Sequence, residues 1–425
     1  MRAHHYESIT IRPIVDARII DFISRFDFSS IPTPAHILFP EILTSNISLF
    51  RSAYEQAGMD SNIFYSCKSN KSRSFLAVAA QENCGIEVSS LYELKDALQY
   101  TNNIIASGPA KSDVYLEFAV NNGVTISVDD IAELELLVAF GKQAKVLLRL
   151  SDLLGVLSRF GINKSQIEKC LEIIAKSKLL FEGFAFHINN YSLEDRISSI
   201  KELLKISNDL GISPRIIDIG GGFPTRYCSQ EDYEKFLRYN SSSMFLFNHG
   251  INSFYPYWAN YEGACAVEYI LCSCSENLGK TKLVIEPGRS LLSNCGITVF
   301  ETMYLKTVYS GENIVVVNGN INSLSEQWFG SEFLVEPLLL SSQLKDNTFL
   351  ASVAGNLCLE QDVLSWRKIK LGAKPVRGDK LIYFNTAGYQ MDSNESCFCK
   401  FPLPPKFVAR KDNDWRLEGD VDYDC

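Results

Sequence analysis

The sequence predicts an α/β fold: a TIM (β/α)8 barrel with a second, C-terminal β-barrel domain that the N-terminal strand joins. Between about residues 60 and 290, eight short apolar runs alternate with segments of helical periodicity. After residue 290, strand-like runs with Gly and Asn turns replace the long helical patterns. Strand–helix alternation implies parallel strands with right-handed crossovers. Eight such units in roughly 250 residues are typical of a closed barrel, with an open doubly wound sheet as the alternative.

The predicted barrel strands are short apolar runs that end in a polar residue or glycine. In chain order they are NIFYSCK (62–68), GIEVSS (85–90), IIASG (104–108), TISVDD (125–130), KVLLRL (145–150), FEGFAFHI (181–188), IIDIGGG (216–222) and KLVIEPG (282–288). Helical periodicity is clearest in 193–211, where Ile197, Ile200, Leu203 and Leu204 fall mostly on one stripe.

The change from strand–helix alternation to strand-like runs sets the expected domain boundaries. The barrel is expected over residues 40–295, and the β domain over 1–39 together with 296–425. The strand-like segment 6–15 is expected to join that β domain as its N-terminal strand. The acidic end of the chain, 412–425, is expected to be solvated and partly disordered.

One connection is much longer than a barrel crossover needs. It runs from Gly222 to Glu286 and contains the aromatic-rich stretch 236–263. Long segments of this kind are often lids or binding loops. The alternative is an insertion packed on the outside of the barrel.

Composition excludes several classes of function. The 425 residues are 46% hydrophobic and carry a formal charge of −9, which suits a globular protein without a strongly basic face for nucleic acid. No signal peptide or apolar run of about 20 residues is found, so no membrane contact is expected. Twelve cysteines without a disulfide framework indicate free thiols and a cytoplasmic location. The CxC pairs Cys272/Cys274 and Cys397/Cys399 would present both thiols on one face if they lay in strands, but no metal site is expected.

The active site of a TIM barrel lies at the C-terminal ends of its strands. Those ends carry, in order, Lys68, Glu87, Ser107, Asp129, Arg149, His187, Gly220–Gly222 and Glu286–Arg289. A lysine in this position is usually only solvated, but partial desolvation makes it a nucleophile for an aldehyde.

The last two strand ends favour a phosphorylated ligand. Three glycines after the seventh strand let backbone N–H groups approach a phosphate closely. Arg289, in VIEPGRSLL, can reach a phosphate, and Glu286 can point into the mouth of the barrel. His187 ends a very apolar strand, where it either belongs to the core or packs on a flat ligand. An aldehyde, a phosphate and an aromatic ring together indicate pyridoxal 5′-phosphate.

At this point the chain resembles the fold-type III pyridoxal-phosphate decarboxylases, the ornithine/diaminopimelate/arginine decarboxylase family, which share their barrel with alanine racemases. Eight motifs occur in family order from residue 65 to 389: YSCKSNK, EVSSLYEL, SRFGI, FHINN, DIGGGFP, EPGR, GNLCLEQD and NTAGY. The resemblance implies a decarboxylase with this cofactor.

The resemblance also implies roles for individual residues. Lys68 binds the cofactor aldehyde covalently, His187 stacks on the ring, and Glu286 meets the ring nitrogen. The other cofactor-binding residues implied are Glu87, Asn190, Gly221, Gly222, Gly288, Arg289 and Tyr389. A carboxylate beside the ring nitrogen favours its protonated form and makes the ring a strong electron sink, which favours decarboxylation over racemisation.

By the same resemblance the protein is a homodimer with active sites shared across the interface. Cys358 matches the cysteine that returns a proton to Cα, on a loop that reaches the other subunit's barrel. Arg159 of one subunit is expected to pair with Asp362 of the other.

Departures from the family pattern bear on the substrate. Leu359 stands where an acidic residue normally holds the distal ammonium, and an unpaired ammonium is costly in a closed site. No arginine follows VNGNINS to hold a distal carboxylate, and Asn189-Asn190 replaces the usual Gly-Ser. Glu87 stands where aspartate is common. We therefore expect an amino acid other than lysine, ornithine or diaminopimelate, or a conjugate of the kind decarboxylated in siderophore and antibiotic pathways.

Four alternatives remain at this point. One is a diaminopimelate- or ornithine-type decarboxylase of primary metabolism, and another is a racemase on the same barrel. A third is a non-catalytic relative that binds a regulatory partner. The fourth is a cofactor-free hydrolase that uses two carboxylates, such as Asp129 with Glu286.

Overall fold

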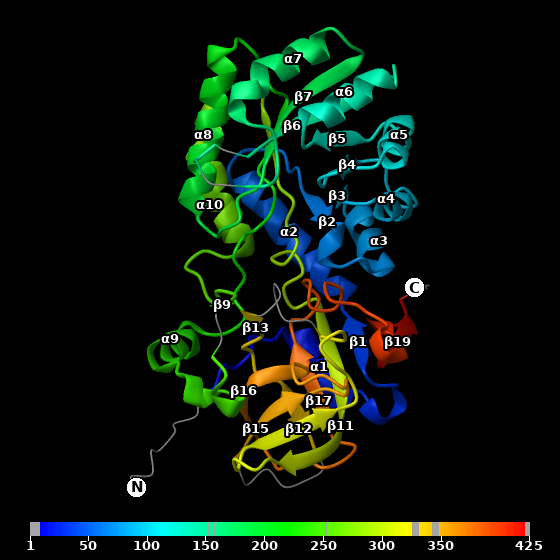
Figure 1. The fold of residues 1–425 in the computed structure, drawn as a ribbon, viewed down its shortest axis with the longest axis vertical. Coiled ribbons are helices and arrows are strands. Elements are labelled where there is room, and N and C mark those ends of the chain that lie inside the picture. Colours follow the sequence, from blue (N-terminus) through cyan, green and yellow to red (C-terminus); the bar gives the residue numbers. More distant parts are fainter. Residues whose placement is uncertain are drawn as a thin grey trace. The chain divides into compact units, whose positions relative to one another are not determined.

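The computed structural model describes residues 9–151, 153–155, 158–250, 253–324, 331–341 and 348–420. The chain divides into two compact units, each coloured along the sequence in Figure 1. The barrel unit consists of Leu43–Pro224 and Tyr261–Leu291. The sheet unit consists of Met1–Ile42, Thr225–Asn260 and Leu292–Cys425.

The barrel unit is built on eight parallel strands, in the sheet order β10-β8-β7-β6-β5-β4-β3-β2. The strands are β2 (Phe64–Ser66), β3 (Gly85–Val88), β4 (Ile104–Ala106), β5 (Thr125–Val128), β6 (Ala144–Leu150), β7 (Leu179–Phe186), β8 (Ile216–Asp218) and β10 (Lys282–Val284). A parallel bridge between Ile63 and Ile285 links the first and last strands, with the Phe64 N–H donating to the Ile285 carbonyl at 2.9 Å. The predicted barrel is therefore confirmed, and the open sheet is excluded.

Helices follow the strands and lie on the outer side of the sheet in Figure 1. They are α2 (Pro40–Gln56), α3 (Arg73–Gln81), α4 (Leu91–Ala97), α5 (Asp113–Asn121), α6 (Ile131–Ala139), α7 (Ile167–Ala175), α8 (Leu193–Asp209) and α10 (Gly263–Leu278), with short 3-10 turns η2 (Cys67–Ser69) and η3 (Lys164–Gln166). Side chains of Ser90, Ser112, Asp130 and Ser192 cap the N-termini of four helices by accepting backbone N–H groups. These caps fix where each strand-to-helix loop ends.

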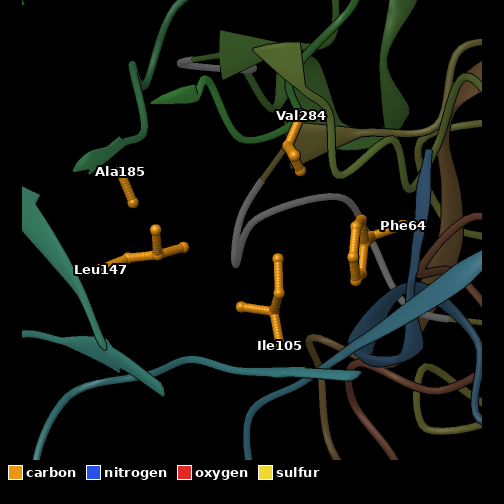
Figure 2. Packing of buried hydrophobic residues seen from close by; sticks show 5 residues of the cluster. All are labelled: Phe64, Ile105, Leu147, Ala185 and Val284. Atoms are coloured by element: carbon orange, nitrogen blue, oxygen red, sulfur yellow. The ribbon is translucent and has the colours of Figure 1, made fainter. Parts of the chain in front are cut away.

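The interior of the barrel is filled by apolar side chains from different strands. Phe64, Ile105, Leu147, Ala185 and Val284 come from β2, β4, β6, β7 and β10, and Figure 2 shows them facing one another. All five are less than a tenth exposed, so the barrel has a packed core and not a pore. Chemistry is therefore confined to the ends of the strands.

The sheet unit is a nine-stranded, mostly antiparallel sheet in the order β16-β15-β12-β11-β1-β18-β19, with β17 paired to both β11 and β14. Its strands, with the separate β9–β13 pair, are β1 (Ala35–Leu38), β9 (Ser253–Phe254), β11 (Gly296–Thr307), β12 (Asn313–Val317), β13 (Ser331–Glu332), β14 (Leu338–Leu340), β15 (Phe349–Ala354), β16 (Val363–Leu371), β17 (Lys380–Phe384), β18 (Lys406–Lys411) and β19 (Trp415–Gly419). Its helices are α1 (Ala17–Arg25) and α9 (Gln230–Tyr239), with 3-10 turns η1 (Phe28–Ser30), η4 (Ser242–Met244), η5 (Leu246–Asn248) and η6 (Phe398–Lys400).

The N-terminal strand of this sheet is β1, and the expectation that segment 6–15 supplies it is wrong for the described residues 9–15. Those residues form only an isolated bridge, between Pro13 and Cys228. Pro13 lacks the N–H that a strand needs for a continuous ladder. The preceding Arg12 is instead held by the Asp232 carboxylate at 3.0 Å.

The end of the chain is ordered further than expected. Residues 415–419 form β19, which pairs antiparallel with β18, and only residues 421–425 lie outside the described part. The Trp415 ring packs edge-on against Phe22 at 5.3 Å, and its indole N–H donates to Asp21 at 2.8 Å. The aromatic contact of the half-buried Trp415 outweighs the acidic composition that suggested a solvated tail.

The aromatic-rich stretch 236–263 is largely part of the sheet unit, because Thr225–Asn260 groups with that unit. Tyr255 and Tyr257 are fully buried, and the Tyr257 hydroxyl donates to the Glu332 carbonyl at 3.0 Å. These aromatic residues therefore form core contacts of their own unit.

The cysteine pairs do not lie in strands. Cys272 and Cys274 lie in α10, where Cys272 is exposed and Cys274 is buried, and Cys397 and Cys399 lie at η6. The condition for two thiols on one strand face is thus not met. Over the described part of the chain, no helix is both long and apolar enough to span a bilayer.

Candidate active site

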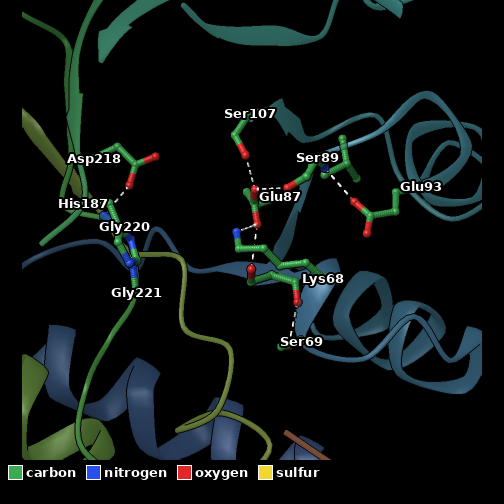
Figure 3. Close-up of polar contacts among 12 residues, drawn as sticks. Lys68, Ser69, Glu87, Ser89, Glu93, Ser107, His187, Asp218, Gly220 and Gly221 are labelled. Atoms are coloured by element: carbon green, nitrogen blue, oxygen red, sulfur yellow. Dashed lines mark hydrogen bonds and ion pairs between the residues drawn. The ribbon is translucent and has the colours of Figure 1, made fainter. Parts of the chain in front are cut away.

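Lys68 lies on the turn η2, directly after β2, and its side chain is 42% exposed. Its Nζ donates to Glu87 Oε2 at 2.6 Å (Figure 3). Because Glu87 lies on the neighbouring strand β3, the parallel register brings the amine and the carboxylate together. The ion pair with Glu87 therefore orients Lys68. The lysine is less desolvated than its position at a strand end led us to expect.

Glu87 is fully buried at the centre of a cluster of donors. Besides Lys68, it accepts hydrogen bonds from Ser66 at 2.6 Å, from Ser89 at 3.1 Å and from Ser107. Burial alone raises the pKa of Glu87, but the Lys68 charge and these hydrogen bonds outweigh it and lower the pKa to about 2. The carboxylate thus stays charged at neutral pH and fixes the direction of the lysine side chain.

The glycine loop, Gly220–Gly222, follows β8 and makes close backbone contacts. The Gly220 N–H donates to Asp218 at 2.9 Å, and the Gly221 N–H donates to Nδ1 of His187 at 3.3 Å (Figure 3). A Cβ on Gly221 would lie 2.4 Å from the Glu286 carbonyl oxygen, so only glycine fits there. Within the described residues, nothing accepts from the Gly222 N–H, which is available to a ligand.

His187 directly follows β7, with its ring next to this loop. Desolvation by the surrounding strands lowers the pKa of His187, and the charges of Lys68 and Arg149 lower it further, although the ring still contacts solvent. Because Nδ1 accepts the Gly221 N–H, a neutral ring carries its proton on Nε2. The residue is a neutral, flat group at pH 7.

Glu286 follows β10, and its backbone N–H donates to the Gly220 carbonyl at 2.9 Å. Its carboxyl group interacts electrostatically with that of Asp218, which is 1% exposed and whose Oδ2 has no hydrogen-bond partner in the described structure. Burial raises the pKa of Asp218 to about 6, and burial with the Asp218 charge raises the pKa of Glu286 well above its ordinary value. Burial therefore favours the protonated form of both carboxyl groups. Arg289, three residues on, is 6% exposed.

A second group of charges lies after β5 and β6. Asp129 accepts from Arg149 at 3.3 Å and from the Gly161 N–H at 3.1 Å. Arg149 and Arg159 both lie over the Phe160 ring, at 4.6 and 4.0 Å from its centroid. Asp129 is therefore neutralised by its own neighbours, which leaves it poorly placed for the two-carboxylate hydrolase.

The remaining predicted site residues belong to the sheet unit. Cys358 and Leu359 are exposed on the turn between β15 and β16, with Leu359 44% exposed. Tyr389 is half-buried after β17 and has a φ of +76°, which is rare for a residue other than glycine. Their predicted roles toward cofactor and substrate stay predictions.

Asp362 is buried beneath the Cys358 turn. Its two oxygens accept backbone N–H groups of Ile321 at 2.9 Å and Leu357 at 2.6 Å. These bonds shape the turn that presents Cys358. The ion pair of Arg159 with Asp362 of a second copy stays a prediction. In such a pair, Asp362 would accept the guanidinium in addition to its two backbone N–H groups.

Sequence reasoning missed three residues of the barrel site. Ser66 lies on the strand before Lys68, and Asp218 begins the glycine motif. Because alternate side chains of a strand point to the same face, residues two positions before a site residue were candidates. Arg196 is fully buried in the first turn of α8 and donates to the Gly221 carbonyl at 2.9 Å. Its signal was a cation at a helix N-terminus, where the helix dipole disfavours positive charge.

Comparison with known proteins identifies the family. Residues 43–293 match the model described as pyridoxal-dependent decarboxylase, pyridoxal binding domain. The chain is 32% identical to the uncharacterized protein y4yA of Sinorhizobium fredii, over 90% of this chain and 89% of that protein. It is 25% identical to an L-glutamyl-[BtrI acyl-carrier protein] decarboxylase of Niallia circulans, over 82% of each chain. It is 24% identical to a diaminopimelate decarboxylase of Bacillus methanolicus, over 88% of this chain and 87% of that one.

Solved structures show the same fold at lower identity. The diaminopimelate decarboxylase of Helicobacter pylori complexed with L-lysine matches with a TM-score of 0.74 and 19% identity, over 92% of this chain and 94% of that one. The lysine decarboxylase of Selenomonas ruminantium matches with a TM-score of 0.72 and 18% identity, over 94% of this chain and 97% of that one.

Proposed function

The chain belongs to the pyridoxal-dependent decarboxylase family, and we propose that it decarboxylates an amino acid carried in a larger conjugate, in preference to free lysine, ornithine or diaminopimelate. Members of this family are carboxy-lyases that use pyridoxal phosphate. The observation that carries the substrate proposal is Leu359, an exposed apolar side chain beside Cys358 where an acid is expected for a free diamino acid. An apolar group cannot balance a distal ammonium.

One relative supports the same direction. The Niallia circulans enzyme acts on a glutamyl group attached to an acyl-carrier protein, which is an amino acid carried in a larger conjugate. By analogy we propose a place for this enzyme in siderophore or other secondary-metabolite biosynthesis. A cytoplasmic location is part of this proposal and is supported by the eleven cysteines of the described residues, which form no disulfide bonds with one another.

The barrel residues fit pyridoxal phosphate. Lys68 offers an exposed amine for the aldehyde at the end of β2. The glycine loop leaves no room for a Cβ at Gly221, and the Gly222 N–H has no partner in the described structure. Backbone N–H groups in such loops bind phosphate. A buried arginine, Arg289, adds positive charge after the adjacent strand.

When bound, the cofactor supplies an electron sink for the pair left at Cα as CO2 departs. In our proposal the chain's own residues set the protons around it. Glu286 holds a proton toward the ring nitrogen, because its pKa is raised by burial and by Asp218. The neutral His187 packs on the ring without adding positive charge. Glu87 keeps Lys68 oriented and compensates its charge.

The final proton comes, in our proposal, from Cys358 of a second copy. Its thiol is exposed on a turn held from beneath by Asp362, so it is accessible to a partner. A homodimer with shared active sites follows from this role. Cys358 then returns the proton to Cα.

The substrate proposal is tested by a screen for CO2 release from purified protein. The panel contains lysine, ornithine, diaminopimelate, amino acids without a distal charge, citrate-linked amino acids and aminoacyl carrier proteins. We expect the highest kcat/KM for a conjugate. Efficient turnover of free lysine, ornithine or diaminopimelate would contradict the proposal and favour the primary-metabolism alternative.

Two controls separate the remaining alternatives. Lys68→Ala should abolish the visible absorbance of the bound cofactor together with CO2 release. In heavy water, decarboxylation gives an amine deuterated at Cα, whereas racemisation gives a deuterated amino acid of inverted configuration without CO2. Absence of both reactions with a bound cofactor would favour a non-catalytic relative.

A further inference from the structure

We propose that Arg196 is a positioning residue for the cofactor phosphate: it fixes the glycine loop and places a buried positive charge behind it. The motifs that carry the family resemblance do not include Arg196. The proposal rests on the cofactor of the family and not on the proposed substrate.

The guanidinium of Arg196 bridges two strand ends. Nη1 donates to the Ser192 carbonyl at 2.9 Å, and Nη2 contacts the Ile188 carbonyl at 3.3 Å, at the end of β7. Nη2 also donates to the carbonyls of Gly221 at 2.9 Å and Gly222 at 3.1 Å, after β8. One side chain thus sets the spacing between the histidine strand and the glycine loop.

These bonds orient the loop for an anion. With the carbonyls of Gly221 and Gly222 turned toward Arg196, the peptide N–H groups are free to point elsewhere, and the Gly222 N–H has no partner in the described structure. Gly222 has a φ of +78°, and a Cβ there would lie 2.7 Å from Arg196 Nη2. The glycine and the arginine therefore require each other.

The charge of Arg196 has no counter-ion in the described residues. The side chain is fully buried, no carboxylate lies within ion-pair distance, and Nε has no hydrogen-bond partner there. Burial lowers the pKa of Arg196 to about 10, so it remains protonated at pH 7. Burial of this cation is costly, and its position in the first turn of α8 is unfavourable to the helix dipole. The nearby Asp195 charge and the Phe223 ring, 5.6 Å from the guanidinium, offset only part of the cost. A dianionic phosphate at the glycine loop offsets both costs.

The same geometry accounts for the missing Gly-Ser after His187. Asn190, expected from the resemblance to bind cofactor, accepts the Ser192 N–H at 2.9 Å and donates to Asp195 at 2.8 Å. Its amide is occupied at the start of α8. We infer that Arg196 replaces the phosphate-side contribution of the usual serine.

The test compares two cofactor analogues that differ only in the phosphate. Apo-protein is titrated with pyridoxal phosphate and with pyridoxal, following visible absorbance. For Arg196→Gln we expect affinity for pyridoxal phosphate to fall roughly tenfold or more, the magnitude of one charged hydrogen bond, with pyridoxal affinity unchanged. Arg196→Lys should keep most of the preference for the phosphorylated form.

A matched control lies on α2, next to the C-terminal end of α3. Arg51 also donates to a backbone carbonyl, that of Glu82, at 2.6 Å, and Arg51→Gln should leave both affinities unchanged. The phosphorus NMR shift of the bound cofactor gives a second readout, which should move in Arg196→Gln and stay in Arg51→Gln.

Equal loss of affinity for both ligands, or no loss for either, would overturn the proposal. If circular dichroism shows that Arg196→Gln does not fold, the Arg196→Lys variant provides the test. Loss of the preference for pyridoxal phosphate over pyridoxal in Arg196→Lys would also overturn the proposal. No substrate enters these titrations, so they are independent of the CO2 screen. Wild-type protein that fails to bind pyridoxal phosphate would instead overturn the assigned cofactor roles.

Discussion

At the scale of single residues, the site combines two carboxylates with opposite pKa shifts. Glu87 has a pKa lowered to about 2, because Lys68 and hydroxyl donors outweigh its burial. Glu286 has a raised pKa, because burial acts together with the negative charge of Asp218. The environment thus favours the anion on the lysine side of the site and the protonated acid on the opposite side.

Glu286→Gln tests the protonated acid. The amide keeps the shape but cannot hold a transferable proton toward the ring nitrogen, so we expect kcat to fall about 100-fold, the typical cost of one electrostatic contact in the transition state. Cofactor absorbance and KM should change little. Glu286→Asp is the conservative control, and a Glu286→Gln enzyme with wild-type kcat would contradict the assigned role.

Leu359→Asp tests the proposed substrate preference. A carboxylate beside Cys358 restores an anchor for a distal ammonium, so kcat/KM for lysine or ornithine should rise roughly tenfold or more, the magnitude of one charged hydrogen bond. Leu359→Asn has nearly the same size without the charge and should not rise. A gain with both variants would show that the effect is steric.

At the scale of elements, the strands were predictable because apolar runs alternate with helices. Each predicted barrel strand overlaps an observed one, but most observed strands end earlier, since β2 stops at Ser66 and Lys68 lies on a turn. Lys68, Glu87, His187 and Glu286 were found because they stand at strand ends.

Other features depend on contacts that no local pattern encodes. Arg196 lies on a helix and reaches the glycine loop only through the packing of α8. Strand β19 forms because Trp415 finds Phe22, nearly four hundred residues earlier in the chain. Segment 9–15 has strand propensity but makes only one bridge, at Pro13. Tertiary contacts override propensity in each case.

The ends of β8 and β10 predict a pH dependence of stability. Asp218 has its pKa raised from 3.8 to about 6, so between these values the folded state binds more protons than the unfolded state. The free energy of unfolding of the apo-protein should therefore fall as pH rises through this window. Asp218→Asn should flatten that fall in denaturant titrations from pH 4 to 6, and an unchanged slope would contradict the assignment.

At the scale of the whole molecule, each unit has its own core, and the sheet unit is completed by the end of the chain. Trp415→Ala should lower the free energy of unfolding by about 2 kcal/mol, less than for a fully buried tryptophan because the ring is partly exposed. Arg416→Ala, in the same strand but making only surface ion pairs, should stay close to wild type. Denaturant unfolding followed by circular dichroism measures both.

Subunit complementation tests the shared site. Lys68→Ala and Cys358→Ala proteins are each expected to be nearly inactive. If Cys358 serves the barrel of a second copy, an equal mixture after subunit exchange should recover about a quarter of wild-type activity, because half the dimers then contain one intact site. A mixture as inactive as its parents would show that both residues act within one chain.

The bridge between Ile63 and Ile285 has a consequence for biosynthesis. Lys68 leaves the ribosome roughly 220 residues before the segment after β10 that carries Glu286 and Arg289. Until then the nascent barrel has an open edge, and the amine can meet free aldehyde without the groups that retain the cofactor. Binding of pyridoxal phosphate is therefore expected to follow translation of residue 289 and to protect the finished barrel from degradation.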